Sequence, residues 1–151
     1  MTTVAPGAPD TPQRGPTEPA QSADTSAGNG LALRVGRPSS NSIVIGIAGE
    51  LDTTTAPRLH ELLAPRLSSR AETVILDLSG LRFLGVAGLE LLAHARRVAD
   101  GRSMTVCIVD GPVCVERALR AAGWHRVVPT FGSVQAAVAE MTGRESAQPL
   151  P

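Results

Sequence analysis

Short apolar runs alternate with amphipathic segments between residues 31 and 143. The apolar runs are rich in Val, Ile and Leu, as is typical of strands, and the run Val74–Leu76 is continuous, as in a strand covered on both faces. The predicted strands are Leu31–Val35, Ser42–Ala48, Thr73–Leu78, Met104–Val109 and a short last one, His125–Pro129. Apolar residues at helical spacing predict helices over Leu59–Leu67, Leu89–Val98, Val115–Ala122 and Val134–Met141.

Local signals mark the ends of these helices. Thr53–Thr55 offers N-cap hydroxyls before the first helix, and Ser133 is expected to cap the last. Pro65 is expected to kink or shorten the first helix near Ala64, because proline lacks the N–H of the helical ladder. Gly123 is expected to end the third helix.

The alternation of strands and helices predicts the fold class. Successive strands joined through helices pair in parallel by right-handed crossovers. The first two predicted strands are close in sequence and can form an antiparallel hairpin at one edge. We therefore expect an α/β fold, a small layer sandwich with a mixed sheet of four to five strands and about four helices.

Both ends of the chain differ in composition from this region. Residues 1–30 consist mainly of Pro, Ala, Thr, Ser and Gly, with almost no large apolar side chain. Such a segment cannot bury enough surface to offset its ordering entropy. We expect residues 1–30 and 144–151 to be disordered tails, and residues 31–143 to be one folded domain.

Composition narrows the classes of function. The chain has 151 residues, with 14 basic and 14 acidic side chains, and every basic residue is Arg. The absence of Lys excludes lysine nucleophiles and the lysine of a P-loop. Zero net charge and an aromatic content of 2% argue against a nucleic-acid partner. No apolar run approaches the roughly 20 residues of a membrane span, and no secretory signal is visible, so we expect a cytoplasmic protein without a membrane partner.

The polar residues give no catalytic or metal-binding motif. His60, His94 and His125 lie on different predicted elements without the spacing of a metal motif. Solvated surface positions are favoured for His60 and His94, which fall on predicted helices beside charged neighbours. Glu50 and Asp52 could form an acid–base pair, but such a pair in a turn is more typical of a cap and a solvated charge. We expect no enzyme activity, no cofactor and no metal.

The two cysteines are too few for a disulfide scaffold. Cys107 lies in a predicted strand, where it is expected to be a small buried apolar residue. Cys114 lies near the start of the third predicted helix. A redox bridge between Cys107 and Cys114, across the intervening turn, is the alternative.

Three segments resemble the STAS domain of bacterial anti-sigma factor antagonists. They are GELDTTTAPRL from Gly49, VILDLSGLRFLGVAGLELL from Val74 and ALRAAGWHRVVPTF from Ala118. The resemblance implies a binding module whose partner is an anti-sigma factor, often an ATP-dependent serine kinase. Binding would free a sigma factor and so regulate transcription by partner switching. In that family, phosphorylation of the loop that opens the second helix switches the antagonist off, because the added charge disrupts the interface.

The sequence departs from the family at that loop. The family motif is Asp-Ser-Ser-Gly or Asp-Ser-Thr-Gly, whereas Gly85–Gly88 reads Gly-Val-Ala-Gly, with Ala87 in the acceptor position. The chain could be a permanently binding-competent antagonist. Control could instead lie at Thr53, which matches a position phosphorylated in some members, or at Ser79; plain cap and turn roles are favoured for both.

A third alternative is a scaffold without a kinase partner, such as an accessory subunit of a lipid-transport or stress-signalling assembly. In each case we expect the two loops of the resemblance to form one partner-binding surface. Leu81, Phe83 and Leu84 could add apolar contacts to it, although Phe83 could instead lie in the core. The predicted surface consists of Glu50, Asp52, Thr53, Gly85, Val86, Ala87 and Gly88.

Overall fold

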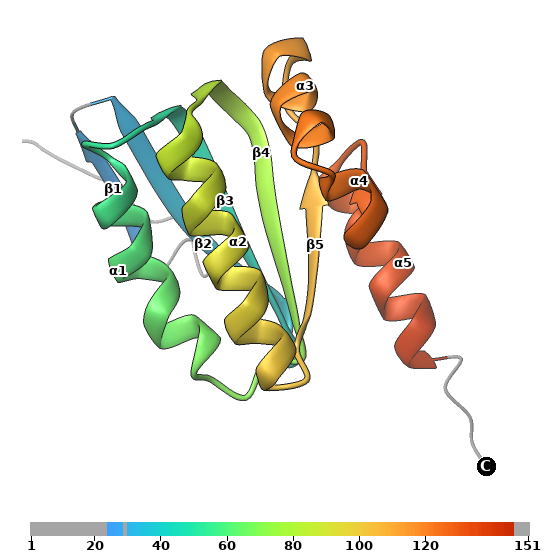
Figure 1. Ribbon diagram of the computed structural model, residues 1–151. Helices are drawn as coiled ribbons and strands as arrows, with labels where there is room; N and C mark the ends of the chain where they lie inside the picture. The colour runs from blue at the N-terminus through green and yellow to red at the C-terminus, as the bar shows by residue number, and fades with distance from the viewer. Residues whose placement is uncertain (1–23, 29, 147–151) are drawn as a thin grey trace, which may run out of the picture.

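A computed structural model describes residues 24–28 and 30–146, which form a six-stranded mixed sheet with helices on both faces (Figure 1). The sheet order is β1-β2-β3-β4-β5-β6. β1, β2 and β3 pair antiparallel, and β3, β4, β5 and β6 pair in parallel. The strands are β1 (Asp24–Gly28), β2 (Leu31–Ser39), β3 (Ser42–Leu51), β4 (Thr73–Leu84), β5 (Thr105–Val109) and β6 (Thr130–Phe131). The predicted α/β class, the mixed sheet and the antiparallel pairing of β2 with β3 are confirmed. The sheet has six strands instead of the expected four to five, and β1, not the β2–β3 hairpin, takes the edge.

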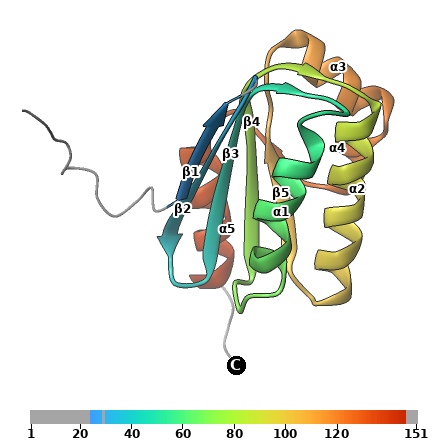
Figure 2. The same cartoon turned by 90° about the vertical axis from the view of Figure 1, so that its left-hand side faces the viewer.

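The helices divide unequally between the two faces of the sheet (Figure 2). They are α1 (Ala56–Leu67), α2 (Val86–Gly101), α3 (Val113–Ala121), α4 (Trp124–Val127) and α5 (Val134–Ser146). The larger apolar cluster joins one face of the sheet to α1, α2, α3 and α4, and includes Ile45, Leu59, Leu92, Leu119 and Trp124. The smaller cluster joins the opposite face to α5 and includes Ile75, Cys107, Ala137 and Met141. Beside α5, residues of β2, β3 and β4 line an open groove of about 480 Å³.

β4 extends to Leu84, beyond the predicted end at Leu78. Two shifts in its register with β3 keep the leucines of this extension buried. β4 has 12 residues and β3 has 10, and their register shifts twice, each time with one extra residue in β4. A one-residue insertion reverses which side chains face the core. As a result Leu78, Leu81 and Leu84 are all buried. The strand therefore continues beyond Leu78 and carries the chain to the start of α2.

The ends of the folded region differ from the prediction. β1 pairs with β2, with Asp24 opposite Val35, although this segment was assigned to the N-terminal tail. Its small and polar residues give no apolar signal, and the pairing depends on the backbone. α5 continues to Ser146, beyond the predicted boundary at residue 143. Residues 1–23, 29 and 147–151 of the predicted tails lie outside the described residues.

The prediction of a strand over His125–Pro129 is wrong, because His125 to Val127 belong to the helical turn α4. Gly123 ends the preceding helix as predicted, with a left-handed φ of 81°. The chain then turns so that Trp124 is buried in the larger cluster, and the N–H of Val128 bonds to the carbonyl of Trp124. Burial of the indole outweighs the strand preference of the valines, and the strand β6 follows afterwards.

Pro65 does not end α1 near Ala64. The helix continues to Leu67, and both Leu63 and Leu67 are buried on its inner face. The N–H of Ser68 bonds to the carbonyl of Pro65, which completes the last turn. At the other end of the chain, the predicted cap of α5 is confirmed, since the Ser133 hydroxyl accepts the N–H of Ala136 at 3.0 Å.

Candidate functional site

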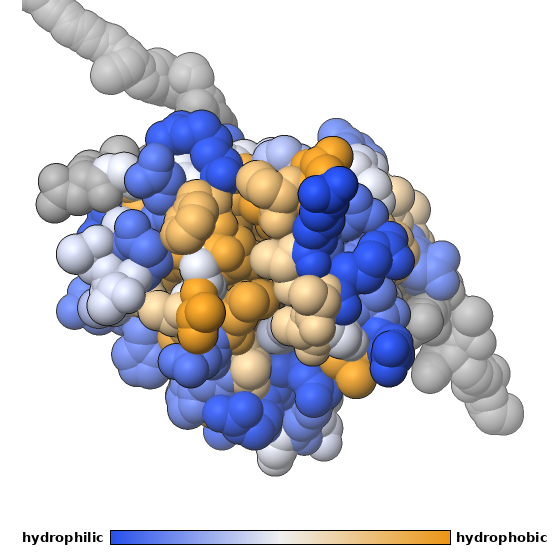
Figure 3. All heavy atoms as spheres, turned by 45° about the horizontal axis from the view of Figure 1, so that its top comes forward, coloured by the Kyte–Doolittle hydropathy of each residue, from blue (hydrophilic) through white to orange (hydrophobic). Residues whose placement is uncertain are grey.

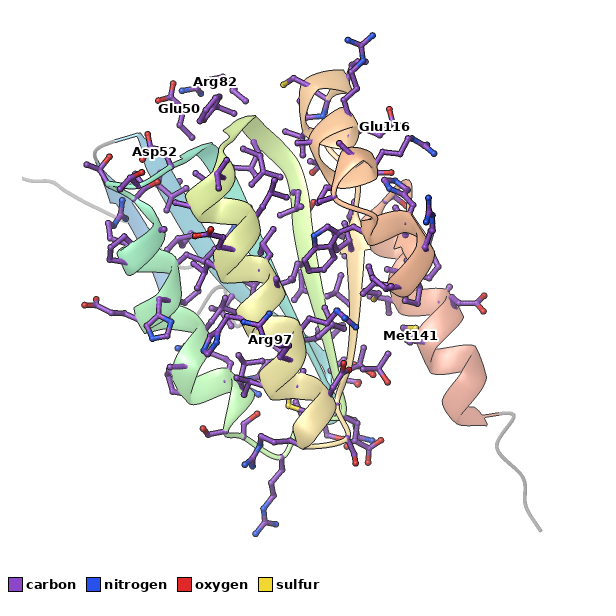
Figure 4. All side chains as sticks on the ribbon, viewed as in Figure 1. Glu50, Asp52, Arg82, Arg97, Glu116 and Met141 are labelled. Atoms are coloured by element: carbon purple, nitrogen blue, oxygen red, sulfur yellow. The ribbon has the colours of Figure 1, made fainter. Side chains whose placement is uncertain are left out.

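The β3–α1 and β4–α2 connections lie side by side at the carboxyl ends of β3 and β4. Glu50 pairs with Phe83 in the sheet register, and the N–H of Gly85 donates to the carbonyl of Leu51 at 3.0 Å. Arg82 Nη2 lies 3.6 Å from Glu50 Oε2, and Figure 4 shows both side chains at the same end of the molecule as Asp52. We call the surface formed by residues 50–54 and 82–87 the loop face.

Hydrogen bonds hold the β3–α1 connection in one conformation. Oδ1 of Asp52 accepts the Thr54 hydroxyl at 2.8 Å and the N–H groups of Thr54 and Thr55 at 3.0 and 3.1 Å. The buried Thr55 hydroxyl donates to the carbonyl of Glu50 at 2.8 Å and accepts the N–H of Asp52 at 2.9 Å. Thr55 occupies the N-cap position of α1 without a side-chain cap bond, so the Asp52 carboxylate is the group that organises this turn.

These bonds make the turn sensitive to acid. The Thr54 hydroxyl, and next the Thr55 N–H, lower the pKa of Asp52, because they stabilise its charged form. A carboxyl whose pKa is lower in the folded state contributes stability above its unfolded pKa of about 3.9, and loses that contribution as the pH falls through its folded value. The free energy of unfolding, measured with urea, is expected to fall between pH 6 and the range of pH 2–3. We expect this fall to be smaller in Asp52→Asn than in the native chain. The same pH dependence in both proteins would contradict this role for Asp52.

Glycines at the β4–α2 connection allow close packing. A Cβ at Gly88 would lie 2.8 Å from both Leu51 Cγ and Leu84 Cδ1, so this position of the family motif needs glycine for steric reasons. A Cβ at Gly85 would lie 3.0 Å from the Phe83 ring. Ala87 is partly buried in the first turn of α2, and its side chain is a methyl group without a hydroxyl.

The loop face carries exposed apolar side chains. Phe83 is 50% exposed and Val86 is 70% exposed, whereas Leu81 and Leu84 are buried. Val113, outside the loop face at the start of the adjoining helix α3, is also exposed. Figure 3 views this end of the molecule and shows apolar residues gathered within a border of hydrophilic ones. Large exposed apolar side chains surrounded by charge are typical of protein-binding surfaces.

The two alternative phosphorylation residues differ in position. Thr53 is exposed on the loop face, and its hydroxyl has no hydrogen-bond partner among the residues that the structure describes. Ser79 lies within β4, beside the groove on the α5 face, and its hydroxyl donates to Asp77 Oδ1 at 2.6 Å. Five residues of β4 lie between Ser79 and Gly85. The expected local hydrogen bonding of Ser79 is confirmed, and its side chain lines the groove rather than the loop face.

The cysteines and the paired carboxylates do not form the arrangements considered as alternatives. Neither cysteine is in a disulfide: Cys107 is buried, and Cys114 is exposed with its sulfur 3.3 Å from the carbonyl oxygen of Arg82. The Asp52 carboxylate accepts a hydrogen bond from the N–H of Thr55 within its own turn, and the Glu50 carboxylate lies beside the Arg82 guanidinium. The structure thus shows neither a redox bridge nor an acid–base pair at these positions.

Sequence reasoning missed two groupings of side chains. Arg82 was not expected to face Glu50, because its position depends on the second register shift in β4. His60 and His94 were assigned to separate surface positions, yet their rings lie 5.9 Å apart between α1 and α2. No linear spacing in the sequence indicates either contact.

The fold and the loop face together define a STAS domain. The sequence model of the family described as "Mlab, STAS domain" matches residues 37–129, and the chain belongs to this family. The match spans β3, β4 and α2, and therefore both connections of the loop face. No helix within residues 24–28 and 30–146 has the length and apolarity needed to cross a bilayer.

Several relatives and solved structures of similar fold are named as antagonists. The anti-sigma-F factor antagonist RsfB of Mycobacterium tuberculosis is 28% identical over 100 residues, which cover 66% of this chain and 81% of RsfB. An anti-sigma factor antagonist from Mycobacterium paratuberculosis has a similar structure, with a TM-score of 0.68, 23% identity and coverage of 76% of this chain and 97% of that one. Unphosphorylated SpoIIAA gives a TM-score of 0.66 at 15% identity, with coverage of 74% and 96%.

Proposed function

We propose that this protein is an anti-sigma factor antagonist that acts in the cytoplasm by binding, without catalysis. Its loop face would bind an anti-sigma factor and release the sigma factor that the anti-sigma factor holds. The observation that carries this proposal is the exposure of Phe83 and Val86 on a preformed surface of the STAS fold. The names of the relatives support the choice of partner.

The loop face has the properties of a preorganised interface. Phe83 supplies an aromatic anchor, and Val86 supplies an adjacent apolar contact at the opening of α2. Aromatic side chains at the centre of an interface commonly carry much of the binding energy. The bonds of Asp52 and of the Gly85 N–H fix both connections before binding, which reduces the entropy lost on association.

Ala87 makes the antagonist permanently competent to bind. A methyl group resembles an unmodified serine side chain in size but cannot accept a phosphate. The negative charge that would disrupt an apolar interface therefore cannot be added at this position. The alternative to permanent competence is control at another hydroxyl, and Thr53 is exposed on the same face.

Ala87→Ser tests this interpretation of the loop. The partner anti-sigma factor, if it is a kinase, is expected to phosphorylate the Ala87→Ser variant in the presence of ATP and to leave the native chain unmodified at this position. Intact-mass and peptide mass spectrometry after incubation with partner and ATP measure the transfer. Ala136→Ser, at an exposed position of α5, is the matched control and is expected to stay unmodified. Equal labelling of both serine variants would contradict a kinase site at the loop face.

Affinity capture from native lysate of the source cell tests the function itself, with mass spectrometry of the partner and of the intact bait. An anti-sigma factor bound to bait of unmodified mass supports a constitutive antagonist. The same partner with a phosphorylated bait moves the control to Thr53 or another hydroxyl. Recovery of transporter subunits, without an anti-sigma factor, would replace the proposal with a scaffold function.

A further inference from the structure

Asp110, Glu116 and His125 come together from three separate segments on the far side of α3 from α2. Asp110 directly follows β5, Glu116 lies in the first turn of α3, and His125 lies in α4. Each offers a ligand atom within 4.8 Å of the other two, and Asp110 Oδ2 lies 3.4 Å from His125 Nε2. Figure 4 shows Glu116 on the face of α3 turned away from α2.

The fold holds two of these groups firmly. The N–H of Asp110 donates to the carbonyl of Phe131 at 3.0 Å, which joins the end of β5 to β6. His125 follows the buried Trp124, and the left-handed turn at Gly123 directs α4 back toward the end of β5. The imidazole and the first carboxylate are therefore placed by the core, not by a flexible loop.

Two polar atoms of this group are buried without a partner. Within the described residues, neither Asp110 Oδ1 nor His125 Nδ1 has a hydrogen bond. Buried polar atoms are almost always satisfied, and an exception often marks the place of an ion or an ordered water. These atoms are the second oxygen of Asp110 and the second ring nitrogen of His125, beside the Oδ2 and Nε2 atoms that lie 3.4 Å apart. A carboxylate that binds an ion through both oxygens would satisfy Oδ1, whereas Nδ1 lies on the other side of the ring and calls for a water.

We propose that Asp110, Glu116 and His125 bind a divalent transition-metal ion, with Zn²⁺ the best match. One imidazole and two carboxylates form a ligand set that zinc accepts, with a fourth position left for water. Ligands at 2.0–2.1 Å in a tetrahedron lie about 3.3 Å apart. The Asp110–His125 separation of 3.4 Å already meets this requirement, and Glu116, with an oxygen within 4.8 Å of both, would have to move closer to complete the set.

Arg120 competes with the ion for Glu116. Its Nη2 lies 2.8 Å from Glu116 Oε2, and its side chain is 61% exposed. The guanidinium neutralises the carboxylate when the site is free and can turn into solvent when an ion binds. Exposed ion pairs on one helix contribute little stability, so the displacement costs little.

Zn²⁺ binding to the tag-free, full-length chain tests the proposal, by calorimetry and by thermal unfolding with and without ZnCl₂. We expect a single site, a rise in the unfolding midpoint with Zn²⁺, and an affinity loss of about tenfold or more in His125→Gln and in Asp110→Asn. Both variants are first compared with the native chain in metal-free unfolding, to separate loss of binding from loss of folding.

His60→Gln and His94→Gln are the matched controls, because their rings lie together elsewhere on the molecule. They are expected to bind Zn²⁺ as the native chain does. Loss of binding in these controls, or native affinity in His125→Gln, would place the ion elsewhere and overturn the assignment. So would the absence of binding by the native chain at millimolar Zn²⁺.

Arg120→Ala tests the third ligand. Removal of the competing guanidinium is expected to tighten Zn²⁺ binding several-fold, whereas Arg126→Ala, an exposed arginine beside His125, is expected to change it less. Unchanged or weaker binding in Arg120→Ala would remove Glu116 from the ligand set. This site does not depend on the proposed antagonist function, since its test uses no protein partner.

Discussion

Gly49→Ala is expected to lower the free energy of unfolding by roughly 3–5 kcal/mol. Gly49 has a φ of 105°, a backbone conformation that residues with a side chain rarely adopt. A Cβ added at this position would overlap the carbonyl oxygen of Gly30. That carbonyl accepts the N–H of Glu50 at 2.7 Å, so it cannot move away without loss of the bond. Urea unfolding followed by the fluorescence of Trp124, the single tryptophan, measures the change.

Gly46→Ala is the matched control within the same strand. A Cβ at Gly46 would make an ordinary contact, 3.7 Å from the Cβ of Arg34, and its φ is not positive. We expect a change within about 1 kcal/mol, and of either sign, because alanine also restricts the unfolded chain. If the two variants unfolded at similar urea concentrations, the strained approach of Gly49 to Gly30 would not be the reason for glycine in this motif.

The parts of the fold that the sequence predicted are those in which pattern and packing agree. Continuous apolar runs identified β3, β4 and β5, and residues at helical spacing identified α1, α2, α3 and α5. The caps at Ser133 and Gly123 followed from residue chemistry that acts within one turn. Because these signals arise from residues close together in the chain, they can be recognised in the amino-acid sequence alone.

The errors occurred where a distant contact decides the local structure. β1 forms because β2 offers an unpaired edge, and its own residues carry no apolar pattern. α4 forms because Trp124 is buried in a cluster built by other elements. The two shifts in β4 keep Leu81 and Leu84 inside by breaking the alternation on which strand prediction depends.

The candidate site was predictable in outline and not in detail. The family resemblance indicated the two connections, and parallel pairing of β3 with β4 brings them together. It did not indicate that Asp52 organises the first turn, or that Phe83 faces solvent beside Gly85. Those features depend on hydrogen-bond geometry and on the second register shift, which appear only in three dimensions.

Val86→Arg is expected to weaken binding of the anti-sigma factor about 100-fold, or about 2.7 kcal/mol, without unfolding the protein. Val86 is 70% exposed, so arginine meets no core residue, and the free energy of unfolding should change by less than about 0.5 kcal/mol. In the complex, the guanidinium would be buried against an apolar surface without a partner, which is strongly unfavourable. Calorimetry with the purified anti-sigma factor measures the affinity.

Val127→Arg is the matched control, because Val127 is also an exposed valine, at 55%, but lies on α4 outside the loop face. It is expected to retain native affinity. A third variant, Phe83→Ala, separates apolar contact from charge: it removes the aromatic anchor without adding a cation and should also weaken binding, by about tenfold or more. Native affinity in both Val86→Arg and Phe83→Ala would show that the partner binds elsewhere. Equal losses in Val86→Arg and Val127→Arg would instead indicate a general effect of added positive charge, and the exposure of Phe83 and Val86 would then need another explanation.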